Sequence, residues 1–358
     1  IFSFFKYEPL TNYSYVGNLP LAISFITFTI IAILVDVKTK KYEDKLNFFS
    51  LSEFLLYFPQ LIAGPILRAN ELIPYLKKKI IFSNENIKFG ILLFTFGFVK
   101  KIFFADSIGS FIDPIFEKQS LSSSEDFLKA FLLFPLQIYF DFSGYVDMAL
   151  GVSKILSINL PINFNKPYLS SSLTEFWRNW HITLSKWFRD YIYIPLGGSK
   201  SGKKKLFFNL IITMSIAGFW HGASLNFILW GFLNGLLLYI EKKISKYFRL
   251  KNSIKILITI FIVFNLWVVF RINDLNFILY FYKNLYSNLF TNLNLENILL
   301  VIFVYFTILS QKIDNFDYIQ KLSKKINFLI LIPILIVILI TGLAIKAGSS
   351  EKFIYFDF

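Results

Sequence analysis

The feature that most constrains this chain is a series of apolar runs, several of them long enough to cross a lipid bilayer. A membrane-spanning helix needs about 20 consecutive, mostly apolar residues. Expected spans lie at residues 19–37, 88–106, 126–141, 206–221, 223–240, 254–271, 296–311 and 326–346, with a weaker one at 142–158. No long linker or internal repeat divides residues 1–358, so we expect one all-α, polytopic membrane domain.

Composition narrows the function classes. Hydrophobic residues make up 55% of the chain, and its net charge of +14 comes from short Lys/Arg clusters between the apolar runs. Such clusters are typical of membrane topology signals rather than of a surface that binds nucleic acid. Because the chain contains no cysteine, disulfides and a cysteine-bound acyl intermediate are excluded. Two histidines are too few for a three-histidine zinc site, so we expect no metal.

Two lysine clusters give the orientation of residues 206–240. One cluster precedes this stretch at 200–205 and the other follows it at 242–249, so both ends should face the cytoplasm. The first arm of the resulting hairpin is about 22 Å long, whereas the hydrocarbon core is about 30 Å thick. His221 is therefore expected inside the membrane, past its midplane, with Gly222 allowing a close turn.

Three further stretches lie outside this pattern. Residues 57–68 are too short and too interrupted by proline and glycine to span, and favour a re-entrant segment. Residues 174–200 interleave aromatic and charged side chains, which is typical of a helix at the cytoplasmic interface. Residues 197–204 have the glycine and lysine spacing of a phosphate-binding loop. They lack its Ser/Thr and its preceding strand, so we interpret them as a basic loop.

His221 is the first candidate for chemistry. An ionisable side chain inside a membrane is costly to bury and therefore usually has a functional role or a polar partner. Burial favours its neutral form, and a neutral imidazole can act as the general base in acyl transfer by removing a proton from a hydroxyl. The alternative is a structural histidine bonded to a neighbouring helix.

For His181 and for an acidic stretch, the sequence supports more than one interpretation. His181 lies between tryptophans in the expected interfacial segment, where a partly solvated structural role is as good an interpretation as a catalytic one. Asp141 and Asp147 lie in an apolar context. They could line a water-filled funnel or pair with Arg178 or Arg189, and Asp141 could instead cap a helix.

Several longer motifs then identify a resemblance. "DFSGYVDMALG", "NFNKPYLSSSLTEFWRNWHITLSKWFRDYIYIPLGG" and "GFWHGASLNFILWG" resemble the signature blocks of the membrane-bound O-acyltransferase family, in its bacterial branch that acetylates alginate and peptidoglycan. "LPLAISFITFTIIAILVD", "YFPQLIAGPILR" and the final "FIYFDF" are also similar to that branch. The family has further spans before the point that corresponds to Ile1, so we expect that native N-terminal spans precede this sequence.

The resemblance implies a ring of transmembrane helices, with re-entrant and interfacial helices around a thin central funnel. It places the family's catalytic histidine at His221 and its second histidine at His181. It also implies that basic side chains at the interface bind the acyl donor. Hydrogen-bond donors are expected near the reacting carbonyl. The residues expected to bind substrate or donor are Arg178, Arg189, Lys186, Lys203, Trp177, Trp220, Asn226, Asp141 and Asp147.

By resemblance, the function is a bacterial inner-membrane O-acetyltransferase. It would take acetyl from a cytoplasmic thioester, either acetyl-CoA or an acyl-carrier protein, and bind no resident cofactor. A periplasmic esterase-like partner of the SGNH type would complete the transfer, in contact with membrane lipid and without nucleic acid. The Lys/Ile/Asn/Phe-rich composition favours peptidoglycan over an alginate-like polymer as acceptor. The alternatives are a transporter or flippase of an acylated precursor, and a non-catalytic scaffold.

Overall fold

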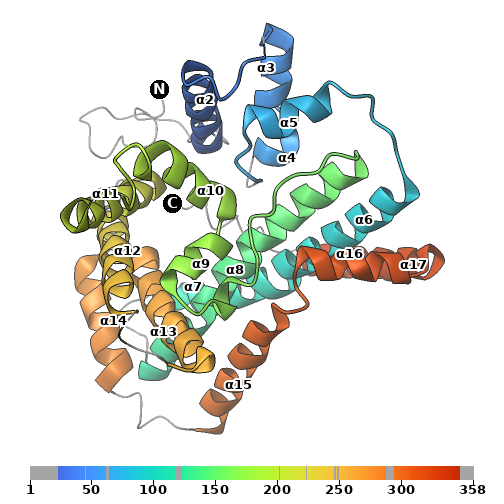
Figure 1. Cartoon of the computed structure of the whole chain (residues 1–358). Coiled ribbons are helices and arrows are strands. Elements are labelled where there is room, and N and C mark those ends of the chain that lie inside the picture. The colour runs from blue at the N-terminus through green and yellow to red at the C-terminus, as the bar shows by residue number, and fades with distance from the viewer. Residues whose placement is uncertain are drawn as a thin grey trace, which may run out of the picture.

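A computed structural model describes residues 23–44, 46–61, 64–117, 123–200, 202–222, 224–245, 247, 250–287 and 294–346, and over these it consists of helices and loops without a strand (Figure 1). The final motif at 353–358 lies outside the described residues. The elements are α2 (Ile23–Lys38), α3 (Phe48–Leu55), α4 (Phe58–Leu61), α5 (Ala69–Leu76), α6 (Asn84–Val99), η2 (Lys100–Ala105), α7 (Asp106–Glu117), α8 (Ser124–Ile155), η3 (Pro167–Leu169), α9 (Leu173–Asn179), α10 (Ile182–Phe188), η4 (Arg189–Tyr193), α11 (Lys203–His221), α12 (Leu225–Ile244), α13 (Asn252–Arg271), α14 (Leu275–Ser287), α15 (Leu295–Ser310), α16 (Phe316–Lys325) and α17 (Phe328–Lys346).

Helix α8 is the central element, in contact with α6, α7, α13, α14 and α15 (Figure 1). Its 32 residues extend for about 48 Å. Ser123 begins it with a capping box, in which the Asp126 carboxylate accepts from the Ser123 backbone N–H at 2.8 Å. The sequence predicted two spans here, at 126–141 and 142–158. That prediction is wrong, because the helix passes through Gly144 without a break.

Glycines inside α8 serve packing instead of ending the helix. A methyl group at Gly97 of α6 would lie 2.5 Å from the carbonyl oxygen of Gly144, and one at Gly144 would lie 2.8 Å from that of Gly97. Gly90 and Gly151 form a second such pair. Small residues at these positions let the two backbones approach closely, as is common between membrane helices.

The hairpin predicted from the lysine clusters is present in the structure. Helices α11 and α12 pack closely along their lengths (Figure 1). A methyl group at Gly235 would lie 2.9 Å from the Cα of Ile211 on the facing helix, so glycine again sets the spacing. Both helices run into the basic clusters, and α11 ends at His221.

By length and composition, two of the described helices, α13 and α17, could each cross a bilayer. Helices α2, α6 and α15 have 16 residues each, fewer than a straight span needs. However, α6 continues without a gap through the π-helical η2 into α7. Helices α14 and α16 were not predicted, since their polar positions interrupt the apolar runs.

The stretch expected to be re-entrant contains one helical turn, α4, followed by a loop. At Gly64 in that loop, a methyl group would lie 2.6 Å from the Cα of Gln60, so the chain can fold back tightly because this position has no side chain. The loop brings Ile66 into the same small buried cluster as Trp220 and Leu184. This stretch therefore reaches the region around the histidines.

Candidate functional site

His221 ends α11 and is enclosed by aromatic rings. Its ring centroid lies 4.8 Å from that of Trp220, 6.1 Å from Phe227, 5.5 Å from Trp230 and 4.9 Å from Phe270. The residue is 5% exposed. An imidazole in such surroundings is separated from bulk water, which strengthens its interactions with any polar group that reaches it.

The turn after His221 depends on Gly222. A methyl group at Gly222 would lie 2.7 Å from the Phe227 ring, so the absence of a side chain lets that ring fold back over the end of α11. The sequence placed a close turn at Gly222 and Ala223; the structure shows the close approach at Gly222, and Ala223 lies outside the described residues.

His181 lies in the turn between α9 and α10, and its surroundings differ from those expected. The sequence predicted a partly solvated ring at an interface, but the residue is 1% exposed and packs edge-on against Phe142 at 4.6 Å. Neither of its ring nitrogens has a hydrogen-bond partner in the part of the chain that the structure describes. This turn lies outside the expected membrane-spanning segments, and burial lowers the pKa of His181 to about 3.

An aromatic cluster joins the surroundings of the two histidines. Trp230, which contacts His221, also stacks on Trp267, with 6.0 Å between the ring centroids. The ring centroid of Trp267 lies 4.9 Å from that of Trp180, which directly precedes His181. The structure therefore brings both predicted histidines to the border of one buried cluster.

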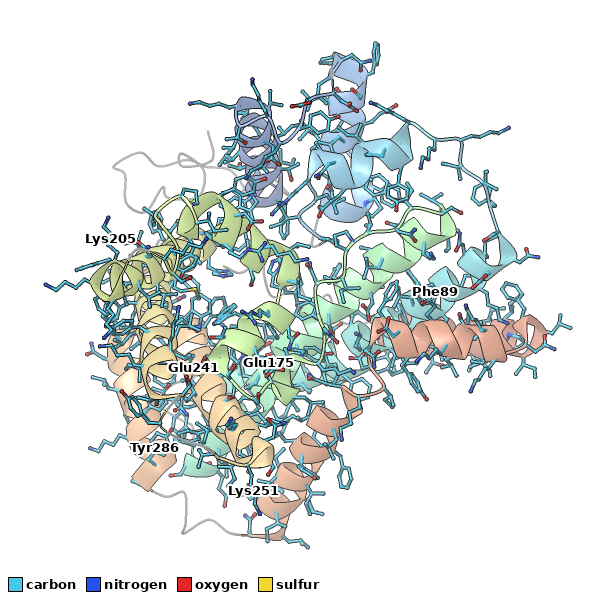
Figure 2. All side chains as sticks on the ribbon, in the orientation of Figure 1. Phe89, Glu175, Lys205, Glu241, Lys251 and Tyr286 are labelled. Atoms are coloured by element: carbon cyan, nitrogen blue, oxygen red, sulfur yellow. The ribbon has the colours of Figure 1, made fainter. Side chains whose placement is uncertain are left out.

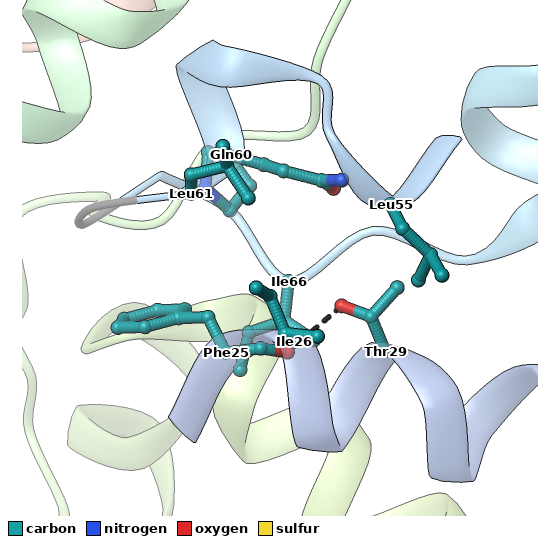
Figure 3. Close-up of a pocket in the computed structure, with 8 residues that line it drawn as sticks. Phe25, Ile26, Thr29, Leu55, Gln60, Leu61 and Ile66 are labelled. Carbon is teal, nitrogen blue, oxygen red and sulfur yellow. Dashed lines mark hydrogen bonds between the residues drawn. The ribbon is translucent and has the colours of Figure 1, made fainter. Parts of the chain in front are cut away.

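The open funnel predicted around the histidines is not confirmed. Within the described residues His221 is 5% exposed and His181 is 1% exposed. A pocket instead lies between α2 and α4, where Phe25, Thr29, Gln60 and Ile66 are among its lining residues (Figure 3). Neither histidine lines this pocket. It is nevertheless connected to the site by packing, because the ring of Phe25 lies edge-on to that of Trp220, with 6.3 Å between the ring centroids.

The predicted basic contacts lie on the surface near the lysine-rich ends of the hairpin. Glu241 near the end of α12 accepts hydrogen bonds from the backbone N–H of Thr174 at 3.2 Å and from its hydroxyl at 2.7 Å, which fixes the first turn of α9 beside the lysines. Figure 2 shows Glu241 and Glu175 side by side on these two helices. The predicted basic side chains are each exposed, at Arg178, Lys186, Arg189 and Lys203.

Arg189 forms an ion pair with the adjacent Asp190. Its Nε donates to Asp190 at 2.6 Å, while Arg68 also binds the Asp190 carboxylate. Burial alone would raise the pKa of Asp190, but the hydrogen bonds and charges of the two arginines hold it below its ordinary value. The side chain of Arg189 as a whole is 55% exposed.

Two of the predicted polar residues have structural contacts that were not expected. Trp177 donates from Nε1 to Asn234 at 3.1 Å. Asn226 is fully buried and its amide donates to the carbonyls of Phe270 at 3.0 Å and Val269 at 3.3 Å. The amide hydrogens of Asn226 are thus bonded to the backbone of α13, which disfavours the predicted role as an oxyanion donor. Trp220 stacks on Phe28 at 5.1 Å.

Asp141 and Asp147 pair with lysines rather than with Arg178 or Arg189, and neither caps a helix. Asp147 accepts from Lys100 at 2.5 Å, and Asp141 forms an ion pair with Lys101. Lys100 also contacts Asp314 at 3.0 Å, which links η2 to the loop after α15. The sequence reasoning missed this buried ionic cluster. Two adjacent lysines inside the apolar run 88–106 were the signal that could have revealed it.

Comparison with known proteins adds a family to this geometry. Residues 18–282 match MBOAT, the membrane-bound O-acyltransferase family. The chain is 39% identical over 271 residues to the probable alginate O-acetylase AlgI of Pseudomonas aeruginosa, covering 75% of this chain and 52% of that protein. It is 38% identical over 320 residues to the peptidoglycan O-acetyltransferase of Helicobacter pylori, covering 77% and 60%. It is 32% identical over 257 residues to the teichoic acid D-alanyltransferase of Streptococcus thermophilus, covering 66% and 60%. The chain thus spans between half and three-fifths of the length of these relatives.

Proposed function

Because the chain belongs to the membrane-bound O-acyltransferase family, we propose that it takes part in moving an acetyl group from a cytoplasmic thioester to a hydroxyl beyond the bacterial cytoplasmic membrane. The observation that carries the proposal is His221, an ionisable side chain buried among four aromatic rings at the end of α11. Such a group is costly to keep in a membrane unless it has a function or a partner.

In the proposed reaction, the hydroxyl oxygen of the acceptor attacks the carbonyl carbon of the thioester. The imidazole of His221 removes the hydroxyl proton as the new C–O bond forms. The C–S bond then breaks, and the thiol leaves with the proton that the imidazole returns. The rings around His221 exclude water from this step, and they have to shift to admit the substrates, since the residue is 5% exposed.

We propose acetyl-CoA as the donor. Its phosphates would meet the exposed basic side chains of Arg178, Lys186, Arg189 and Lys203. Guanidinium groups are well suited to phosphate because they donate in pairs. His181 would help to position the donor or the acceptor.

We propose a cell-wall polysaccharide as the final acceptor, with peptidoglycan favoured over an alginate-like polymer. Two relatives are named for the acetylation of these polymers. A periplasmic esterase-like protein of the SGNH type would receive the acetyl group and pass it to the sugar. The acceptor hydroxyl at His221 would then belong either to that partner or to the polymer itself.

The proposal is tested by replacing His221 in cells. His221→Ala should reduce ester-linked acetate on the wall polymer by about a hundredfold or more, because a general base contributes about that much. Phe281→Leu, a change to a fully buried ring on α14 that packs on Phe116 and Phe127, controls for a loss of stability. Normal acetylation with His221→Ala protein present at the wild-type level would refute the enzyme and favour the transporter or scaffold.

A further inference from the structure

The backbone at His181 adopts a conformation that this residue does not favour by itself. Its φ of 40° and ψ of 57° lie in the left-handed region. A side-chain-bearing residue in this region costs free energy and persists where its surroundings hold it there. The contacts that hold this turn therefore also determine where the imidazole lies.

Asn163 holds the two residues that follow His181. Its backbone carbonyl accepts from the N–H of Ile182 at 2.9 Å. Its side-chain oxygen accepts from the N–H of Thr183 at 3.1 Å and from the Thr183 hydroxyl at 2.6 Å. Asn163 is itself fully buried, so these bonds form without competition from water.

Thr183 extends this arrangement to the loop after α4. Its hydroxyl oxygen accepts from the backbone N–H of Ile66 at 3.0 Å while its hydrogen is donated to Asn163. Ile66 packs in the same buried cluster as Trp220, which precedes His221. One hydroxyl thus connects the loop, the His181 turn and the surroundings of His221.

The imidazole of His181 takes no part in the hydrogen bonds among the described residues that hold the turn. Its two nitrogens lack hydrogen-bond partners among the described residues although the ring is buried. Burying unpaired polar atoms is unfavourable, whereas the side-chain oxygens of Asn163 and Thr183 that shape the turn are both bonded. A ring fixed by its neighbours but left with both nitrogens unbonded is expected of a group that meets a substrate.

We propose that Thr183 and Asn163 are positioning residues that hold the His181 imidazole in place for acyl transfer. The proposal rests on the proposed function for its kinetic consequence, but not for its structural one. Thr183 acts through the placement of His181 and does not touch the reacting atoms.

The kinetic test compares Thr183→Val, which keeps the shape of the side chain and removes the hydroxyl, with Thr183→Ser, which keeps the hydroxyl. In the purified full-length protein, Thr183→Val should lower kcat by about tenfold to a hundredfold, the scale of a misplaced catalytic group. Thr183→Ser should recover most of the activity. Thr259→Val is the matched control, because Thr259 is equally buried and its hydroxyl bonds only to Lys255 of its own helix at 2.9 Å.

A second readout does not depend on activity. Histidine-selective isotope labelling of the full-length protein gives imidazole signals that His181→Gln and His221→Gln variants assign. Thr183→Val should shift the His181 signals or split them between positions, and the change should exceed that caused at His181 by Thr259→Val.

The outcomes separate the two proposals. Unchanged His181 signals in a folded Thr183→Val protein would overturn the positioning role whether or not the protein transfers acetyl. Equal loss of activity in the Val and Ser variants would also overturn it. If wild-type protein shows no transfer but Thr183→Val still displaces the His181 signals, the positioning role stands and the proposed function fails.

Discussion

At the scale of single residues, the two histidines are buried in different ways. His221 is in contact with four aromatic rings. His181 packs on Phe142, and its turn is fixed by Asn163 and Thr183. The sequence placed both residues by motif, but it could not show that His181 is buried. That burial comes from Phe142 on α8, which is distant in sequence.

The low pKa of His181 predicts a pH-dependent stability. Below the ordinary histidine pKa of about 6.5, the unfolded chain binds a proton at His181 that the folded chain does not bind until near its pKa of about 3. The stabilisation is complete above about pH 6.5 and falls with decreasing pH by up to about 1.4 kcal/mol per pH unit. His181→Gln should remove this part of the slope.

Thermal unfolding in detergent between about pH 7.5 and about pH 4.5 measures this effect. Wild-type protein should lose more of its Tm than His181→Gln over this interval. Parallel losses in the two proteins would show that His181 is not kept neutral by the fold.

At the scale of helices, close packing and buried charge determine how α6, η2 and α8 fit together. Glycine pairs set the distance between α6 and α8, and the lysines of η2 bind carboxylates on α8. The π-helical turn places both lysines inside the bundle, where they are at most 8% exposed. Regular apolar periodicity does not predict such a turn, which explains why the sequence reasoning missed it.

The glycine contacts predict a steric effect. Gly97→Ala would place a methyl group 2.5 Å from the Gly144 carbonyl oxygen and 2.8 Å from the Met148 nitrogen, so the helices have to separate. We expect a loss of about 1–3 kcal/mol, typical of overpacking. Ser107→Ala, at an exposed position on α7, should have little effect. A Tm for Gly97→Ala equal to that of the control would contradict the close approach.

The ionic cluster predicts a larger effect. Lys100→Met leaves the carboxylates of Asp147 and Asp314, which are 17% and 13% exposed, without this buried cation, and we expect destabilisation of about 3 kcal/mol. Lys324→Met breaks an exposed pair with Glu85 at 3.2 Å and should change stability by less than about 1 kcal/mol. Similar unfolding midpoints for the two variants would show that the Lys100 ion pairs stabilise the fold no more than an exposed ion pair does.

At the scale of the whole molecule, the hairpin orientation can be checked by labelling. The chain has no cysteine, so an introduced one is easily followed in a background without other cysteines. Lys204→Cys at the start of α11 should react with a membrane-impermeant reagent from the cytoplasmic side. Asp274→Cys, which follows the candidate span α13, is expected to react from outside. Labelling of both from the same side would contradict the topology.

Much of the architecture followed from the sequence, and the exceptions have physical causes. Apolar run lengths located the described α-helices of 16 or more residues but not most of the shorter ones, and the lysine clusters located the α11–α12 hairpin, because both signals are local. The single helix α8 was divided wrongly, since Gly144 was not recognised as a packing residue. The lysine partners of Asp141 and Asp147 come from η2, and one of them also binds Asp314 in the loop after α15. Contacts of that kind depend on tertiary structure and not on nearby sequence.

The central claim is that the imidazole of His221 is the base in acetyl transfer. The most direct measurement reconstitutes purified full-length protein in liposomes with isotopically labelled acetyl-CoA on one side and an acceptor hydroxyl compound on the other. Wild-type protein should form labelled acetyl ester, and His221→Ala should form it at a rate lower by about a hundredfold or more. Ester formation at equal rates by the two proteins would contradict the account.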